Sequence, residues 1–388
     1  MRYFLLLVFF VFLNGCQNRS LFSHDNAVIL HDEAFAGFEQ YQIESSEEIF
    51  YLGDDAKLFA KESIKGVYRP KEQIVALVEA IFARSDFNLL YRADANTTAQ
   101  QTFVNRAANC LSLSIMTYAL AFELGFGARF QNIEVPEYWT RREGQSVLNS
   151  HINLQILPKM DRNLVEVKRQ GFEVDFGVQM TKKHDKKTLL TRSQVISFFY
   201  NNKGSDALLN KNYLLAYAYY RAAYLQAPRQ TQLLANLGYL YRLNEFYSYA
   251  ENAYQQALNI DKNSLTAWQN LAFLYKHTDQ AEKSAQILVR LEHKRASNPY
   301  YHLSLGDAAF EREDWQQALA YYRRALSLDK NLHEVFFGLG KTYYELGEME
   351  RSKYYLQMAK RKSRSEQEQL IYAGKLEFLR RHSLLKTS

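Results

Sequence analysis

The C-terminal half of the chain repeats its pattern of apolar and small residues every 34 positions. A leucine followed by Gly or Ala recurs at Leu237, Leu271, Leu305 and Leu339. Further along each repeat, small residues share one register and mostly large residues share another, four positions later. These positions are Ala250, Ser284, Ala318 and Ser352, followed by Tyr254, Leu288, Tyr322 and Leu356. Small residues let two antiparallel helices approach closely, and the large ones fill the space to the next repeat, so the pattern predicts stacked helical pairs.

This pattern resembles the tetratricopeptide repeat, which implies an all-α solenoid over residues 197–366. Four full units fit 231–264, 265–298, 299–332 and 333–366, and the unit before them ends in Ala216, Tyr220, Ala223 and Pro228. The unit 265–298 departs from the pattern, since Leu291 stands where alanine is usual. Residues 367–388 are expected to form a helix that caps the solenoid, followed by a basic tail.

The resemblance also implies a concave face lined by the first helix of each unit. The residues that it nominates for a partner groove are Tyr239, Arg242, Phe273, Lys276, Asp307, Phe310, Lys341 and Tyr344. Mixed aromatic and charged side chains suit a protein or peptide segment better than a small metabolite. In the alternative interpretation, the groove packs against the N-terminal domain of the same chain.

The first residues predict export and lipid attachment. The apolar run from Tyr3 to Leu13 is too short to cross a bilayer but suits the core of a secretory signal. It ends in Leu13-Asn14-Gly15-Cys16, which resembles a bacterial lipobox, so residues 1–16 are interpreted as a lipoprotein signal with Cys16 as the lipidated residue. Gln17 then implies a cell-envelope lipoprotein in the outer membrane, facing the periplasm. The alternative is an ordinary signal peptide or anchor whose cysteine is coincidental.

Between the expected linker and N-terminal extension at 17–69 and the repeats, residues 70–195 mix two kinds of pattern. Helical spacing covers Gln73 to Ala83, and an almost wholly apolar helix is expected from Cys110 to Leu124. Short β-rich stretches follow. They are 128–135, 152–157, 164–167 and 172–176. The segment is therefore expected to form an α+β domain.

Three residues of this segment suit nucleophilic catalysis. If Cys16 carries lipid, Cys110 is a lone thiol, because the chain has only two cysteines. In the first turn of a helix, its thiolate would be favoured by the unpaired N–H groups and the helix dipole. His151, at the start of a strand, is suited to act as a general base, and Asp175 is suited to fix the tautomer of the imidazole. The structural alternative is a small apolar residue that caps a core helix.

The order of these residues along the chain resembles the transglutaminase-like superfamily, which is related to papain-fold cysteine proteases. The matching stretches are 109–112, 150–153 and 174–176. Asn153 and Phe176 depart from the family, which often has an aromatic residue at the first position and proline or a small polar residue at the second. The resemblance implies a cysteine amidase, peptidase or acyltransferase, and the alternative is a degenerate, non-catalytic binding module that serves as a scaffold.

Composition narrows the remaining function classes. The net charge of +6 is mild for 388 residues, and basic residues do not form one block with interleaved aromatics, which argues against nucleic acid as a partner. No glycine-rich phosphate loop and no spaced Cys/His pattern occurs, so no cofactor and no metal are expected. The acidic and histidine residues at 31–33 are interpreted as linker. The expected whole is a membrane-anchored α+β transglutaminase-like domain joined to a tetratricopeptide solenoid that recruits a protein or peptide.

Overall fold

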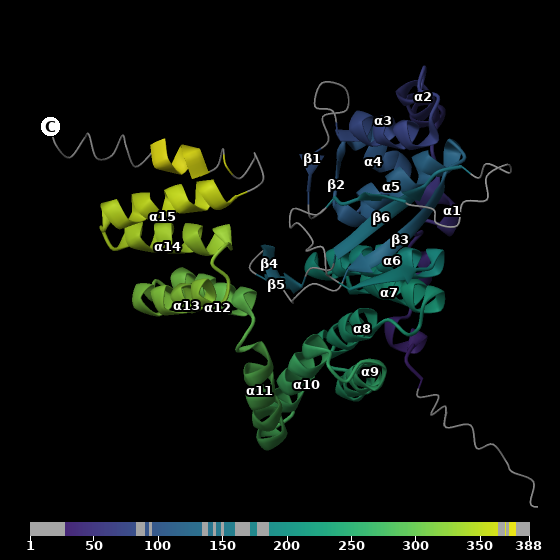
Figure 1. Ribbon diagram of the computed structural model, residues 1–388. Coiled ribbons are helices and arrows are strands. Elements are labelled where there is room, and N and C mark those ends of the chain that lie inside the picture. The colour runs from purple at the N-terminus through teal and green to yellow at the C-terminus, as the bar shows by residue number, and fades with distance from the viewer. Residues whose placement is uncertain are drawn as a thin grey trace, which may run out of the picture.

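The computed structural model describes residues 28–82, 90–92, 95–133, 139–142, 145–148, 151–159, 171–176, 186–363, 369 and 372–377. The expected signal peptide with Cys16, the β-rich stretch at 164–167 and the basic tail from 378 lie outside the described residues. Figure 1 shows a sheet with several helices at one end of the molecule and a curved array of paired helices at the other. Within the described part of the chain, no helix combines the length and the apolar character needed to cross a membrane.

The main sheet has four antiparallel strands in the order β7-β6-β3-β8. They are β3 (Gly127–Ile133), β6 (His151–Leu157), β7 (Phe172–Val174) and β8 (Lys187–Leu190). Two further pairs join β1 (Leu90–Tyr91) to β2 (Ala107–Ala108) and β4 (Trp139–Arg142) to β5 (Gln145–Leu148). The strand predictions are confirmed at 128–133, 152–157 and 172–174, whereas residues 175–176 follow β7 and residues 134–135 lie outside the described residues. Strand β8 was not predicted, because its first residue ends a run of charged residues that is typical of a loop.

Helix α5 (Cys110–Glu123) packs against β3 and β6, and most of its side chains are buried. This explains why its sequence is apolar on nearly every side, in contrast to the one-sided pattern of a surface helix. The ring of Tyr118 stacks on Phe130 of β3, with centroids 4.8 Å apart. Among the described residues, four helices precede α5. They are α1 (Ser46–Phe50), α2 (Asp54–Ser63), α3 (Pro70–Phe82) and α4 (Ala99–Asn105).

From residue 192 to residue 362, the chain forms a helical-repeat solenoid of five antiparallel pairs (Figure 1). The pairs are α6 (Arg192–Leu209) with α7 (Tyr213–Gln226), α8 (Thr231–Leu243) with α9 (Tyr247–Ile260), α10 (Leu265–His277) with α11 (Ala281–Arg295), α12 (Pro299–Glu311) with α13 (Trp315–Leu328), and α14 (His333–Glu345) with α15 (Met349–Lys362). The 34-residue pattern thus predicted the paired helices and the steric reason for them. A Cβ added at Gly238 would lie 2.6 Å from the ring of Tyr254, and one at Gly306 would lie 2.5 Å from that of Tyr322.

The stacking is looser at one place, between α11 and α12. The second helix of one unit packs closely on the first helix of the next at α7–α8, α9–α10 and α13–α14, whereas α11 and α12 approach only weakly. The apolar core divides at the same place. One cluster extends from the N-terminal region to Tyr275, and a second begins at Ala309.

Residues 28–44, here called the strap, run along the outer side of the first two helical pairs, away from the β4–β5 hairpin (Figure 1). The strap contains the 3-10 turns η1 (Asp32–Phe35) and η2 (Phe38–Gln40). Phe35 stacks on Tyr217 with ring centroids 4.4 Å apart, and Tyr241 donates a hydrogen bond to the carbonyl of Ile29 at 2.7 Å. The stretch expected to be linker is therefore ordered from residue 28 onward: the strap packs against the repeats, and α1 and α2 pack against α3, α4 and α5.

At the other end of the array, residues 372–377 are helical. Tyr372 is buried against Phe336 and Ala359, and its hydroxyl lies 2.9 Å from Nδ1 of His333. This short helix packs where the capping helix was expected, and the remainder of that expectation lies outside the described residues.

Candidate functional site

The nominated groove residues lie on the first helices of their units, and some of them contact one another through cation–π interactions. The guanidinium of Arg242 lies 4.9 Å from the ring centroid of Tyr239. Further along the array, the ammonium of Lys341 in unit 333–366 lies 4.2 Å from the ring centroid of Phe310 in unit 299–332. Such cation–π contacts hold long side chains in one place without neutralising their charge.

Asp307 is already engaged by its own chain. Its carboxylate accepts a hydrogen bond from Lys341 at 2.9 Å and another from the hydroxyl of Tyr322 at 2.7 Å. Burial, with the Asp307 charge as a further cause, raises the pKa of Tyr322 far above its usual value. Asp307 therefore ties adjacent helical pairs together and has less capacity left for a partner.

The middle of the array presents the most available groove residues. The side chain of Phe273 is 46% exposed, and Lys276, one turn further along α10, is exposed as well. Strand β4 of the hairpin contacts α12 (Figure 1), so part of the array faces another part of the same chain. That contact supports the alternative in which the N-terminal domain covers some of the groove.

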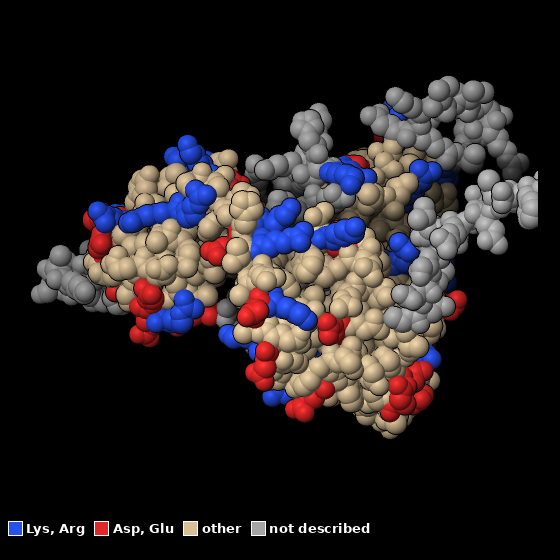
Figure 2. All heavy atoms as spheres, turned by 90° about the horizontal axis from the view of Figure 1, so that it is seen from below, with Lys and Arg blue, Asp and Glu red and all other residues tan. Residues whose placement is uncertain are grey.

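Lys and Arg side chains form a band across the face shown in Figure 2, with separate acidic groups around it. This distribution agrees with the small positive net charge of +6. On the face seen in Figure 2, the basic groups are therefore more continuous than the acidic ones.

Cys110 is the first residue of α5. The side chain of Asn109 caps the helix by accepting the main-chain N–H of Ser112 at 2.9 Å. The sulfur accepts hydrogen bonds from the main-chain N–H groups of Leu111 and Ile152, and both lower its pKa. Burial outweighs them, with a smaller contribution from the Asp175 charge, and raises the pKa of Cys110 to about 11. This shift is opposite in direction to the effect expected from the helix N-terminus alone, and the predicted thiolate stays a prediction.

The three predicted catalytic residues come from adjoining elements. The sulfur of Cys110 touches β6 at Ile152, the residue that follows His151. Strand β7 pairs with β6 through Val174 and Leu154, and Asp175 follows directly and acts electrostatically on the thiol. The backbone of His151 belongs to β6, but its imidazole lies outside the described side chains. The tertiary arrangement thus gathers the three positions, and their catalytic roles remain predictions.

A polar chain that the sequence did not reveal connects Cys110 to the repeats. The amide of Asn109 donates to the side-chain oxygen of Asn96, and the amide of Asn96 donates to Asp206 on α6. The N-terminus of the cysteine-bearing helix is therefore fixed to the first helix of the solenoid. Only the tertiary structure brings these residues together, since they are spread over more than a hundred positions of the sequence.

On the paired strands β3 and β6, two buried polar side chains have acceptor oxygens without a hydrogen-bond partner. Gln131 of β3 and Asn153 of β6 are opposite each other in the register, and they are 8% and 1% exposed. Asn153 stands where the resembled family often has an aromatic residue. Among the residues that the structure describes, no group of His, Cys, Asp or Glu is arranged to hold a metal ion.

Comparison with known proteins supports the repeats. A family model described as "TPR repeat" matches residues 306–347, so the chain contains tetratricopeptide repeats. No curated protein sequence matches the chain. The transglutaminase-like resemblance of residues 70–195 has no support from these comparisons.

Several solved structures are similar to part of the chain. The structure of YrrB, described as a TPR protein with an unusual peptide-binding site, is 18% identical, covers 46% of this chain and 92% of its own, and has a TM-score of 0.25. The structure of pilF from Pseudomonas aeruginosa is 18% identical, covers 48% and 85%, and has a TM-score of 0.28. That of MamA from Desulfovibrio magneticus RS-1 is 15% identical, covers 44% and 96%, and has a TM-score of 0.26.

Proposed function

We propose that this protein is an interaction scaffold whose repeat array binds a protein or peptide segment. The observation that carries the proposal is the exposure of Phe273 beside Lys276 on α10, in the part of the array where an aromatic and a cationic side chain are both available. An aromatic anchor that is rimmed by charge is typical of sites that recognise a peptide segment.

The test is site-specific photo-crosslinking in the source cells, with a photoreactive amino acid in place of Phe273. A discrete protein adduct should form, and Lys276→Ala should reduce its yield. The matched control places the same photoreactive residue at Val289 on α11, which is 69% exposed. Equal labelling from both positions, or an adduct indifferent to Lys276, would contradict the proposed groove.

A second candidate function is cysteine-dependent acyl transfer, with the repeats recruiting the substrate. It is favoured by the contact between the Cys110 sulfur and β6, immediately beside His151, and by the proximity of Asp175. In this reaction the imidazole takes the thiol proton, and the sulfur attacks the amide carbonyl carbon. The C–N bond then breaks and the amine leaves with that proton, after which water or another amine releases the acyl group. The competing assignment is a non-catalytic binding module.

The pH dependence of Cys110 alkylation separates these two assignments. A thiol with a pKa of about 11 reacts ever faster as the pH rises towards that value. An imidazolium at His151 would instead stabilise the thiolate and give a second, lower-pH plateau that His151→Ala removes. His293→Ala, at an exposed position on α11, is the control. A single rise near pH 11 that is indifferent to His151 would favour the non-catalytic module.

We also propose that the chain is a lipoprotein of the cell envelope, anchored through Cys16 in the outer membrane and facing the periplasm. This part rests on the sequence of residues 1–17 alone. Cys16→Ser should move the protein from the membrane to the soluble fraction, as measured by fractionation and immunoblotting. Unchanged membrane partitioning would contradict lipid anchoring at this residue.

A further inference from the structure

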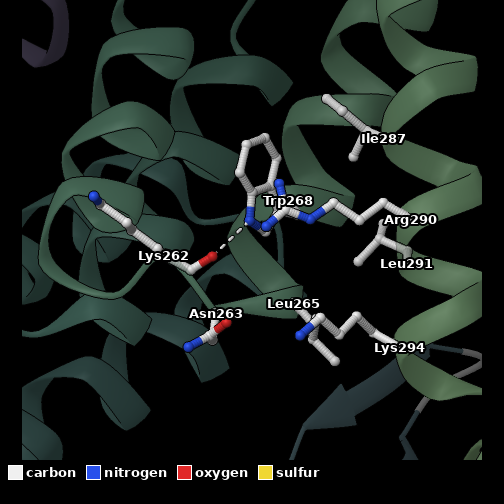
Figure 3. Close-up of a pocket in the computed structure, with 8 residues that line it drawn as sticks. All are labelled: Lys262, Asn263, Leu265, Trp268, Ile287, Arg290, Leu291 and Lys294. Atoms are coloured by element: carbon white, nitrogen blue, oxygen red, sulfur yellow. Dashed lines mark hydrogen bonds between the residues drawn. The ribbon is translucent and has the colours of Figure 1, made fainter.

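The unit 265–298 carries a shallow notch in addition to its part of the groove. Figure 3 shows the side chains that line it, from the turn before α10, from the start of α10 and from the middle and end of α11. They are Lys262, Asn263, Leu265, Trp268, Ile287, Arg290, Leu291 and Lys294. None of these residues belongs to the nominated groove positions, so the notch is a separate surface, formed by the unit 265–298 and the turn that precedes it.

The aromatic group of the notch is held in place. Nε1 of Trp268 donates a hydrogen bond to the carbonyl oxygen of Lys262 at 2.9 Å, and the guanidinium of Arg290 lies 5.1 Å from the indole centroid (Figure 3). Leu265 and Leu291 supply apolar surface around the ring. A pre-organised indole costs little conformational entropy on binding, which is why such groups serve as anchors at interfaces.

The charges at the notch are mostly of one sign. Lys262, Arg290 and Lys294 are exposed, and among the residues that the structure describes none of the three forms an ion pair with a carboxylate. Arg290 and Lys294 are one helical turn apart and share a face of α11.

Two carboxylates lie near these cations in the sequence. Glu292 points to another side of α11, where it influences Tyr301. Asp261 accepts the N–H of Asn263 at 2.9 Å and thereby closes the turn before α10. The notch therefore keeps an excess of positive charge.

We propose that this notch docks an acidic segment of a partner protein, with carboxylates against the three cations and an apolar side chain on the indole. Charge complementarity carries the assignment. The notch is too shallow to enclose a small metabolite, since such sites bury most of their ligand. A segment spanning the notch can instead present several carboxylates at once. The inference rests on the scaffold function proposed above and adds to it the chemistry of a second contact surface.

The test uses a short dye-labelled peptide of alternating Glu and Leu, with a Gln-for-Glu peptide for comparison, and fluorescence anisotropy as the readout. Replacing Lys262, Arg290 and Lys294 together by Gln should weaken binding of the acidic peptide about tenfold, because exposed charges each contribute modestly. The charge-matched control is Lys330→Gln with Lys353→Gln and Lys360→Gln, three exposed positions elsewhere on the array. It should change the affinity less than about twofold.

Equal weakening in the two triple variants would overturn the proposal, because it would show attraction to net charge alone. Equal binding of the Gln peptide, or no binding of the acidic peptide by the unaltered protein, would overturn it as well. Notch-dependent binding to vesicles containing phosphatidylglycerol, without binding of the peptide, would assign the surface to a membrane instead. Phe273→Ala with Lys276→Ala should leave peptide affinity unchanged, so failure at the notch and failure of the groove are distinguishable.

Discussion

Two neighbouring units of the solenoid, 231–264 and 265–298, have the same helical pairing but different packing. In the first, Tyr254 is fully buried against Gly238. In the second, the corresponding residues are Leu288 and Ala272, and Leu288 is 41% exposed. The methyl group of Ala272 occupies the space that Gly238 leaves open in the first unit. Leu288 is also smaller than Tyr254, so it does not pack in the same way.

The two units also differ in how closely they pack on the neighbouring parts of the chain. The unit 231–264 packs closely on the next one through α9 and α10, and the strap adds contacts such as the stacking of His31 on Tyr249 at 3.5 Å. The unit 265–298 has Leu291 where the other units have alanine, and α12 packs only weakly on it. The larger Leu291 and the missing tyrosine at position 288 are the two side-chain differences that accompany this looser junction. The comparison indicates that a few side-chain volumes decide where the array is tightly stacked and where it presents exposed surface.

The largest expected effect comes from removing the buried ring. Tyr254→Ala should lower the free energy of unfolding by about 3–5 kcal/mol, because a fully buried aromatic side chain leaves a large cavity. Leu288→Ala, at the equivalent position of the next unit, should cost less than about half of that because the side chain is partly exposed. Urea titrations followed by circular dichroism measure both. Equal losses would show that the two units pack alike.

Adding a methyl group to the tight contact should have the next largest effect. A Cβ at Gly238 would lie 2.6 Å from the ring of Tyr254, and the strain should exceed the gain in helix propensity, for a net loss of about 1–2 kcal/mol. The reverse change, Ala272→Gly, should cost about 1 kcal/mol through backbone entropy alone. Thermal melts of the two variants compare them. A stabilised Gly238→Ala variant would refute the steric account of the repeat.

The sequence predicted the helical repeats better than it predicted the strap that packs on them. A period of 34 residues reflects a steric requirement within each repeat, so positions such as Gly238 and Tyr254 can be recognised from their place in the repeat. The strap does not, because its polar sequence around Asp32 is typical of a linker and gains its partners only when Tyr217 and Arg221 are brought to it from the repeats.

The candidate cysteine site also has some features that the sequence predicts and others that only the tertiary structure shows. The start of α5 at Cys110 and the strand at His151 follow from local patterns. The raised pKa of the thiol does not, because it comes from burial by surrounding elements that no local pattern specifies. The chain of side chains from Asn109 through Asn96 to Asp206 is invisible in the sequence for the same reason.

The third test of the comparison changes the strap, which contacts helices of the first two pairs. Asp32 accepts hydrogen bonds from Arg221 and Tyr217, both at 2.8 Å, and the Arg221 contact is the main cause that lowers the pKa of Asp32 below its ordinary value of 3.8. Because the carboxylate is partly exposed, Asp32→Asn should cost only about 0.5–1 kcal/mol. The charged form is favoured in the folded state, so this contribution is present above pH 3.8 and is lost as the pH falls below it.

Denaturant titrations of the native and Asp32→Asn proteins at neutral pH and below pH 3.8 measure this difference. The gap between the two should narrow in acid. Lys57→Gln, which removes an exposed charge 4.0 Å from Asp54, is the control for a surface ion pair outside the strap. A gap that stays constant with pH would assign the effect to the shape of the side chain rather than to its charge.

The smallest expected effect comes from giving the unit 265–298 the pair found in its neighbours. Leu288→Tyr alone should be close to neutral, because the ring meets the methyl group of Ala272 but can remain in solvent. Together with Ala272→Gly, the tyrosine has the space that Tyr254 has against Gly238, so the double variant should be more stable than the sum of the single changes by about 0.5–1.5 kcal/mol. Amide hydrogen exchange at the start of α12 should slow as well, since a filled position 288 offers that helix a surface to pack on.

In unit 299–332 the equivalent ring, Tyr322, lies against both Gly306 and Gly338, a residue of the following unit. If the two changes are merely additive and exchange in α12 is unaltered, the weak stacking arises from Leu291 rather than from the missing tyrosine, and Leu291→Ala becomes the change that closes the junction.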